Sequence, residues 1–295
     1  MNTSAPRFSI VVPAYNAAAT ISDTIESVLG QDGFDDWQLL ITDDGSSDDT
    51  LAIVRGYAAR DSRISVETQP NAGAGAAITA AIKRASGEFI VQLGADDALL
   101  PEYCRTTDAF IRAHPGYDIY ASDAYRLLPD GRRIRYHEGP RFAGVFSLTV
   151  DDMLDAPQIF GAAAFRREWF DRVGGFRTEY YNEDYDFWLR AMIAGARHIY
   201  QPLPLALYRV VPGQKTADGI HAREGDVAVL RSAIAEGGLT PEQVQHAERT
   251  IALVEKNIAF RRRVLGLVGP RAASRVFKAA HALAWFIRPH RRKGV

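Results

Sequence analysis

Two pairs of adjacent carboxylates follow apolar runs that are typical of buried strands. Asp96 and Asp97 come just after the run 88–93, and Asp43 and Asp44 end a similar run earlier in the chain. In an open α/β sheet, ligands bind in the crevice beyond the carboxyl ends of the strands. Asp96 and Asp97 could hold Mg²⁺ or Mn²⁺, and the ion would neutralise a diphosphate leaving group. Asp43 or Asp44 could instead accept hydrogen bonds from a base or ribose. The alternative for each pair is a solvated turn that caps the following helix.

A third acidic cluster, Asn182-Glu183-Asp184, stands where a polar helix start runs into an amphipathic segment. The ordinary explanation is helix capping, with Asn182 as the cap and the two acids in the first turn. The functional alternative makes Asp184 a general base, because the positive end of the helix dipole favours its ionised form. In that form the carboxylate could accept a proton from an acceptor hydroxyl.

Strand-like and helix-like stretches alternate through roughly the first 115 residues, which is the pattern of a parallel sheet built from βαβ units. We expect strands at 8–13, 38–42, 64–67 and 88–93, and helices at 20–29, 49–59, 74–85 and 101–113. Farther along, the pattern predicts short strands at 118–121 and 133–136, and helices at 166–173 and 182–190.

The last third of the chain has the pattern of helices. Thr240 and Gln243 can form a capping box, and Gly269-Pro270 is expected to break the chain before a final helix over 271–287. The sequence therefore predicts an α/β fold, with a mostly parallel sheet flanked by helices and a C-terminal helical extension. We expect a nucleotide-binding half at 1–115, an acceptor-binding half at 116–215 and a helical region with a basic amphipathic tail at 216–295.

The bulk composition suits a soluble globular protein: 295 residues, 47% hydrophobic and 24% charged. Cys104 is the one cysteine, so no intramolecular disulfide can form and a reducing cytosol is expected. The N-terminal residues lack the basic and apolar regions of a signal peptide. No apolar stretch approaches the roughly 20 residues that span a bilayer. We therefore expect a cytoplasmic protein.

The charge is unevenly distributed. Residues 256–295 hold 11 Lys or Arg and no acidic residue, which leaves 24 basic against 36 acidic residues elsewhere. A basic amphipathic helix with Trp and Phe on its apolar side can lie at the surface of an anionic membrane. Peripheral binding to the inner face of the plasma membrane is therefore one expectation, and packing of this helix on the enzyme body is the alternative. Nucleic-acid binding is not expected, because no recognised binding motif accompanies the charge.

Several cofactor motifs are excluded. The run 71–78 has Ile78 where a dinucleotide-binding G-x-G-x-x-G motif needs its third glycine, and no Walker-type phosphate loop occurs. The seven histidines are scattered without ligand spacing, so a zinc site is not expected. Phe187 and Trp188 fit a core best, although one aromatic of this pair could face a sugar.

The ordered set of clusters resembles the family 2 glycosyltransferases with the GT-A fold. The segments that carry the resemblance lie at 10–16 (IVVPAYN), 27–31, 43–50 (DDGSSDDT), 71–73, 85–90, 95–101 (ADDALLP), 165–168, 173–176, 183–190 (EDYDFWLR) and 207–209. The resemblance implies transfer of a sugar, with inversion at the anomeric carbon, from a nucleotide diphosphate donor such as a UDP-sugar. It also implies a Mn²⁺ or Mg²⁺ cofactor and a glycan or lipid-linked acceptor in cell-surface polysaccharide synthesis.

The resemblance also implies roles for individual residues. The nucleotide would contact Pro13, Ala14, Tyr15, Asp44, Asn71, Gly73 and Asp96; the metal would contact Asp96 and Asp97; and the acceptor would contact Gly161, Ala162, Glu183 and Trp188. Asp184 matches the catalytic base. The chain departs from the family pattern at Gly94, where the first Asp of a D-x-D motif is usual. It lacks the Gln-x-x-Arg-Trp motif of the processive members, so we expect one sugar to be added per acceptor.

Two other functions stay open at this point. A nucleotidyltransferase would also use an α/β sheet and carboxylate-bound Mg²⁺, but it would release pyrophosphate and would not need the acidic cluster at 182–184. A degenerate, non-catalytic module that binds a nucleotide or glycan would bind a donor without turnover. It would explain three departures from the family pattern: Gly94, Ile78 in place of a frequent arginine, and Val211 in place of a frequent histidine.

Overall fold

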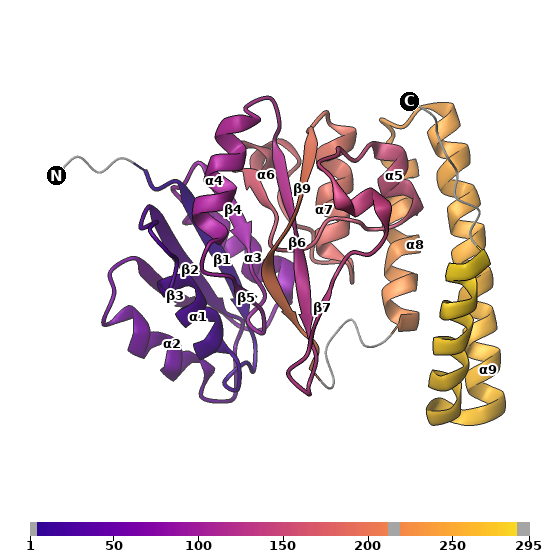
Figure 1. The fold of residues 1–295 in the computed structure, drawn as a ribbon, viewed down its shortest axis with the longest axis horizontal. Helices are drawn as coiled ribbons and strands as arrows, with labels where there is room; N and C mark the ends of the chain where they lie inside the picture. Colours follow the sequence, from indigo (N-terminus) through magenta and orange to yellow (C-terminus); the bar gives the residue numbers. More distant parts are fainter. Residues whose placement is uncertain (1–4, 212–218, 288–295) are drawn as a thin grey trace.

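The computed structural model describes residues 5–211 and 219–287, and for 270–287 it describes the backbone alone. The strands are β1 (Phe8–Ala14), β2 (Trp37–Asp43), β3 (Ile64–Thr68), β4 (Phe89–Gln92), β5 (Ala98–Leu99), β6 (Ile119–Leu127), β7 (Arg133–Arg135), β8 (Ala164–Arg166) and β9 (His198–Arg209). They form one sheet in the order β3-β2-β1-β4-β8-β6-β9-β5, with β7 beside β6 (Figure 1).

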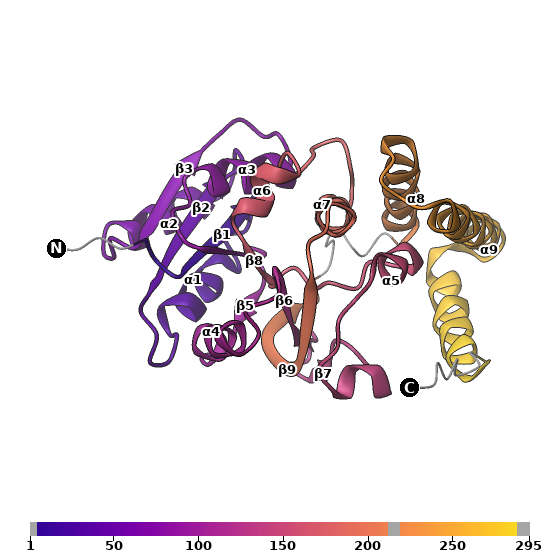
Figure 2. The same cartoon turned by 90° about the horizontal axis from the view of Figure 1, so that it is seen from above.

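Helices cover both faces of this sheet and extend beyond one end of it (Figure 2). They are α1 (Ile21–Leu29), α2 (Thr50–Ala58), α3 (Ala74–Lys83), α4 (Tyr103–Ala113), α5 (Val150–Asp155), α6 (Glu168–Arg172), α7 (Glu183–Ile193), α8 (Gly219–Glu236) and α9 (Pro241–Ile287), with a 3₁₀ turn at Pro140–Ala143. The expected α/β fold with a helical extension is therefore present.

In the parallel half of the sheet, the strands β1, β2 and β4 are buried on both faces. In β1, Ile10 packs in one core with Ile21 of α1, whereas its neighbour Val11 packs in a second core with Ile78 of α3. Successive side chains of a strand point to opposite faces, so a continuous apolar run serves both cores. Each fully buried Val or Ile stabilises the fold by about 1.5–3 kcal/mol.

The second half of the sheet departs from the parallel order. β8 runs antiparallel to both β4 and β6, β5 runs antiparallel to β9, and β7 forms an antiparallel pair with β6. The sheet is therefore mixed. This change follows the loss of the strand–helix alternation after residue 117: β7 follows β6 directly as its antiparallel partner, and β8 runs antiparallel to both of its neighbours. The expected halves at 1–115 and 116–215 share this one sheet, and their division stays a prediction.

β9 links the second half of the sheet to the loop that follows β4. It runs parallel to β6, with register shifts on either side of Asp123, and its last residues also pair with β5. Pro202 and Pro204 lie at this irregularity, where a residue without an N–H disturbs no regular ladder. Beyond it, β9 reaches the loop that follows β4.

The C-terminal helices lie at the end of the molecule opposite β3 (Figure 1). α9 begins with the expected capping box, in which Thr240 Oγ1 accepts from the Gln243 N–H and the Gln243 side chain accepts from the Thr240 N–H. Gly269 has a φ of 72°, so the expected break is present there. Across the described residues, no helix is both long and apolar enough to cross a membrane.

Candidate active site

Asp44 anchors the loop that leads into α3. Its carboxylate is 3% exposed and accepts hydrogen bonds from the backbone N–H groups of Ala72 (2.9 Å) and Gly73 (2.8 Å). The side-chain amide of Gln69 donates a third, at 2.8 Å. Sequence reasoning expected Asp44 to contact the nucleotide and did not indicate this loop-holding role. The carboxylate thus fixes the backbone of 72–73 at the carboxyl edge of β2.

The end of β1 lies beside this loop. The Asp44 N–H donates to the Ala14 carbonyl at 2.8 Å, which joins the ends of β1 and β2. Ala14 itself is 1% exposed, whereas Tyr15 is 54% exposed. An exposed ring at the carboxyl edge of a parallel sheet is placed to stack on a flat base.

Asp96 and Asp97 gather their carboxylates over Gly94. A Cβ at position 94 would lie 2.9 Å from Asp96 Oδ1 and 2.9 Å from Asp97 Oδ2, so glycine leaves room for both groups. Thr24 of α1 holds the loop that contains Asp96 and Asp97, because its hydroxyl donates to the Asp97 carbonyl at 2.7 Å. The glycine at position 94, where the family usually has an Asp, is therefore the residue that leaves space for the two carboxylates.

Arg209, at the end of β9, closes this loop from the other side. Its N–H donates to Asp97 Oδ1 at 3.0 Å, and its Nε donates to the Asp96 carbonyl at 3.0 Å. Its Nη2 donates to Asp23 of α1 at 2.8 Å. Sequence reasoning quoted Arg209 in the segment 207–209 but gave it no role.

The electrostatics of the pair favour a bound cation. Burial and the negative charge of Asp96 together raise the pKa of Asp97 to about 8. Burial also raises the pKa of Asp96. The described residues contain no group of three or more His, Cys, Asp or Glu side chains that could hold a metal. Two hard oxygen ligands fit Mg²⁺ or Mn²⁺, since such ions are commonly held by one or two carboxylates and completed by water and substrate phosphates.

Asp184 lies in the first turn of α7, as expected, and is partly exposed. Its Oδ1 accepts from the Tyr185 N–H at 2.7 Å, which fixes the carboxylate at the helix N-terminus. Behind it, residues 185–189 of the helix are buried, and Phe187 stacks on Phe176 with ring centroids 4.3 Å apart. The carboxylate thus lies at the start of a helix whose body packs in the core.

Trp188 lies in the core and not on the acceptor surface. Its side chain is 1% exposed and packs edge-to-face on Phe165 of β8, with centroids 5.2 Å apart. The assignment of Trp188 to acceptor binding is therefore wrong. Its neighbour Phe187 is 0% exposed, so neither ring of this pair faces a sugar.

Three aromatic side chains pack together as an aromatic wall. The wall consists of Tyr136, Phe160 and Tyr208, with Tyr136 5.1 Å from Phe160 and 5.5 Å from Tyr208 between centroids. Burial, the neighbouring Tyr208 and, to a smaller extent, the negative charges of Asp184 and Asp97 together raise the pKa of Tyr136 to about 12.

The wall contains residues that sequence reasoning missed. Tyr208 had a signal, since it belongs to the quoted segment 207–209, but Tyr136 had none. Next to Phe160, the carbonyl of Ala162 accepts from the Tyr103 hydroxyl at 2.6 Å and the Ala162 side chain is 2% exposed. Of the expected acceptor residues in this turn, Gly161 is the more open.

The loop held by Asp44 also touches the segment before α7. A Cβ at Gly75 would lie 2.7 Å from the Arg177 carbonyl oxygen and 3.6 Å from Glu183 Cβ. The Thr79 hydroxyl donates to the Phe176 carbonyl at 3.4 Å. α3 and α7 are thereby packed together, so the expected nucleotide loop and the expected base lie on neighbouring elements.

The chain belongs to glycosyl transferase family 2, whose family model matches residues 9–174. It is therefore a glycosyltransferase, which favours sugar transfer over nucleotidyl transfer. EpsE of Bacillus subtilis is 28% identical over 215 residues, covering 70% of this chain and 73% of EpsE. Hyaluronan synthase of Pasteurella multocida is 37% identical over 239 residues, which are 79% of this chain but 24% of the synthase.

Solved structures show the same fold. The structure of Staphylococcus aureus TarS 1–349 in complex with UDP-GlcNAc matches with a TM-score of 0.70 at 22% identity, covering 90% of this chain and 76% of that one. The mannosyltransferase PcManGT of Pyrobaculum calidifontis, in complex with GDP-Man and Mn²⁺, matches with a TM-score of 0.67 at 22% identity, covering 96% and 81%. These likenesses confirm the GT-A type fold.

Proposed function

We propose that this chain is an inverting glycosyltransferase that moves a single sugar from a nucleoside diphosphate donor, with UDP-sugars as first candidates, to a glycan or lipid-linked acceptor. One observation carries the proposal. The loop that Asp44 holds leads into α3, and a Cβ at Gly75 of α3 would lie close to Arg177 and Glu183, just before Asp184. The expected nucleotide loop and the expected base therefore lie on neighbouring elements.

In the proposed reaction, Asp184 accepts the proton of an acceptor hydroxyl. The hydroxyl oxygen forms a bond to the anomeric carbon of the sugar, and the bond from that carbon to the donor phosphate breaks. The electron pair of the broken bond leaves with the nucleoside diphosphate. A Mn²⁺ or Mg²⁺ ion, when bound by Asp96 and Asp97, would neutralise the charge on that leaving group.

The donor pocket in this proposal lies between β1 and the loop 71–73. The ring of Tyr15 would stack on the base, while Asp44 and Asp96 would contact the ribose together with the backbones of Pro13, Ala14, Asn71 and Gly73. On the acceptor side, Gly161 and Glu183 would contact the incoming sugar beside Asp184. The partial exposure of Gly161 and Glu183 supports this division.

Relatives and structural neighbours support the finer parts of the proposal. TarS was solved with UDP-GlcNAc, and PcManGT with GDP-Man and Mn²⁺, so both protein structures carry nucleotide-sugar donors. TuaG of Bacillus subtilis, 39% identical over 156 residues, is named for teichuronic acid biosynthesis. The name of the similar hyaluronan synthase also refers to the synthesis of a polysaccharide. We therefore place this chain in the synthesis of a cell-surface polysaccharide.

The first experiment is thermal stabilisation by a panel of UDP- and GDP-sugars, each with and without Mn²⁺. The proposal predicts a rise in Tm with one donor that depends on Mn²⁺. The stabilising donor is then used in transfer assays with Asp184→Asn, and with Asp130→Asn as a control carboxylate in the exposed β6–β7 turn. Turnover should vanish in Asp184→Asn while donor binding persists. An active Asp184→Asn variant would show that Asp184 is not the catalytic base.

We also propose that the chain acts in the cytoplasm at the inner face of the plasma membrane, through residues 256–295. In the described part of this region, Phe260 is 49% exposed and Leu267 is 74% exposed, and Arg263 is exposed as well. Arg271, Arg275, Lys278 and the cluster 288–293 lie outside the residues whose side chains are described. Exposed apolar groups beside cations suit an anionic bilayer surface.

Co-sedimentation with phosphatidylcholine vesicles, with and without phosphatidylserine, tests the membrane proposal. Binding should need phosphatidylserine and weaken in Leu267→Ser. The control is Leu203→Ser, which removes a leucine that is 47% exposed in β9, away from the tail. Equal binding to both vesicle types would contradict the proposal, and so would an equal loss of vesicle binding in Leu267→Ser and Leu203→Ser.

A further inference from the structure

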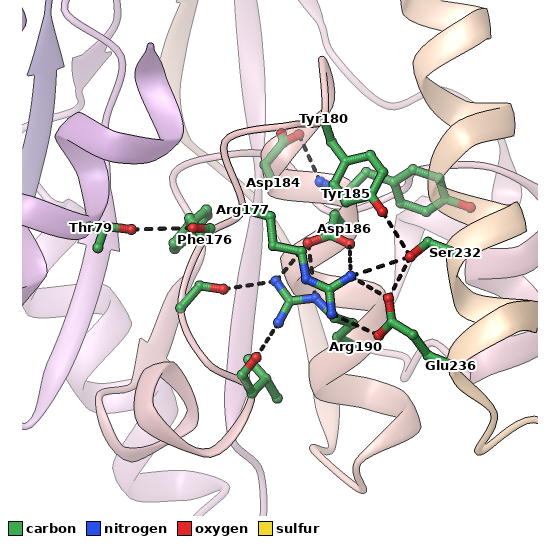
Figure 3. A network of polar contacts seen from close by, with 12 residues as sticks. Thr79, Phe176, Arg177, Tyr180, Asp184, Tyr185, Asp186, Arg190, Ser232 and Glu236 are labelled. Atoms are coloured by element: carbon green, nitrogen blue, oxygen red, sulfur yellow. Dashed lines mark hydrogen bonds and ion pairs between the residues drawn. The ribbon is translucent and has the colours of Figure 1, made fainter. Parts of the chain in front are cut away.

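A network of charged side chains ties the catalytic helix α7 to α8, and Arg177 stands at its centre (Figure 3). Its guanidinium makes a two-pronged contact with Glu236 at the end of α8, with Nη2 donating to Oε2 at 2.7 Å. The same guanidinium lies 3.5 Å from Oδ1 of Asp186 in α7. One arginine thus joins a carboxylate of α8 to a carboxylate of α7.

Asp186 is the buried end of this network. Its side chain is 2% exposed, and its Oδ2 accepts from Arg190 Nε at 2.9 Å and Nη2 at 2.6 Å. Arg190 also donates to the Gly175 carbonyl at 2.8 Å. A buried carboxylate needs such partners, because an uncompensated charge in the interior is strongly destabilising. Asp186 follows Asp184 by two residues, in the same helical turn.

A second contact from α8 reaches the start of α7. The Asn182 amide donates to Asp226 Oδ1 at 2.7 Å and to the Ala222 carbonyl at 2.8 Å. Asp226 is 7% exposed. α8 therefore holds the residue before α7 through Asp226, and the first turn of α7 through Glu236 and Arg177. The proposed base lies between these two attachments.

We propose that Glu236 is a positioning residue for Asp184, acting through Arg177 and Asp186. α8 lies outside the stretch 9–174 that matches the family model, so the C-terminal extension would form part of the machinery for the transfer step. The inference rests on the proposed role of Asp184 as the base. The contacts from α8 would hold the Asp184 carboxylate within a fraction of an ångström of its reacting position. Such precision matters because small misplacements of a reacting group can lower the rate up to about 100-fold.

The first test compares hydrogen exchange at the backbone amides of 183–186 in the full chain and in Glu236→Gln. Removing the charge should speed exchange there by roughly tenfold, which is the effect of losing one hydrogen bond to a charged group. The matched control is Glu255→Gln on α9. Glu255 is similarly exposed (48% against 41%) and contacts Arg231 at 2.6 Å, but it has no contact with α7 among the described residues. Unchanged exchange in Glu236→Gln, or equal change in both variants, would overturn the proposal.

The second test measures transfer with the donor found by thermal stabilisation. Glu236→Gln should lower kcat about tenfold or more and leave the donor KM unchanged, while Glu255→Gln keeps both. Arg177 and Glu236 belong to the same chain of contacts. The double variant Arg177→Gln/Glu236→Gln should therefore lose little more transfer activity than either single variant. A wild-type chain without turnover on any donor would refute the proposed function, and the exchange measurement would still decide the role of Glu236.

Discussion

Replacing Gly75 with alanine tests whether α3 and the segment before α7 are packed as tightly as the structure shows. The new Cβ would lie 2.7 Å from the Arg177 carbonyl oxygen, a backbone atom that cannot rotate away. Overpacking of this kind costs about 1–3 kcal/mol. The higher helix propensity of alanine offsets up to about 1 kcal/mol of that cost. The net loss in the free energy of unfolding is then about 0–2 kcal/mol.

Gly56→Ala is the matched control, since Gly56 is also helical and a Cβ there meets nothing within 4 Å. It should gain up to about 1 kcal/mol from propensity alone. Urea unfolding of both variants isolates the clash as a difference of about 1–3 kcal/mol between them. Transfer should also fall in Gly75→Ala, because α3 and α7 are forced apart. Equal stabilisation in the two variants would refute the reasoning.

Three further outcomes are expected. Asp44→Ala should lower the free energy of unfolding by about 1.5–3 kcal/mol and weaken nucleoside diphosphate binding in calorimetry, because two backbone N–H groups lose a charged acceptor. Trp188→Ala should cost about 3–5 kcal/mol in urea unfolding; a fully stable variant with weaker acceptor binding would return Trp188 to the acceptor site. The Arg177 hydrogen bond lowers the pKa of Glu236 from 4.5 to about 2, so its contribution to stability is complete above pH 4.5 and is lost as the pH falls towards 2. Unfolding of Glu236→Gln should show a weaker loss of stability over this pH range, and identical curves would contradict the ion pair.

The parallel half of the fold could be predicted because each of its strands is a short apolar run followed by a helix-like stretch. The predicted strand 8–13 is observed as Phe8–Ala14, and 38–42 as Trp37–Asp43. Burial on both faces makes such runs continuous, which is a local signal. The carboxylates that end these runs were found for the same reason.

The rest of the site depends on contacts that local spacing does not encode. β9 was not predicted, because two prolines argue against a strand unless an irregularity accommodates them. The aromatic wall gathers Tyr136 just after β7, Phe160 from the turn at 160–163 and Tyr208 from β9, and no period in the sequence connects them. For Trp188, the residue pattern favoured the core and the family resemblance implied the acceptor side; the structure places the side chain in the core.

The end of β9 also limits which changes in chain length the protein can accept during evolution. Tyr208 contributes its ring to the aromatic wall, and the side chain of the next residue, Arg209, donates to the Asp96 carbonyl. Successive side chains on a strand alternate between faces, so inserting one residue just before Tyr208 would exchange these two positions. The irregular stretch opposite Asp123 can absorb an extra residue before the strand end is reached. Insertions and deletions in homologous chains are therefore expected to gather at 202–205 and to be absent from 206–209.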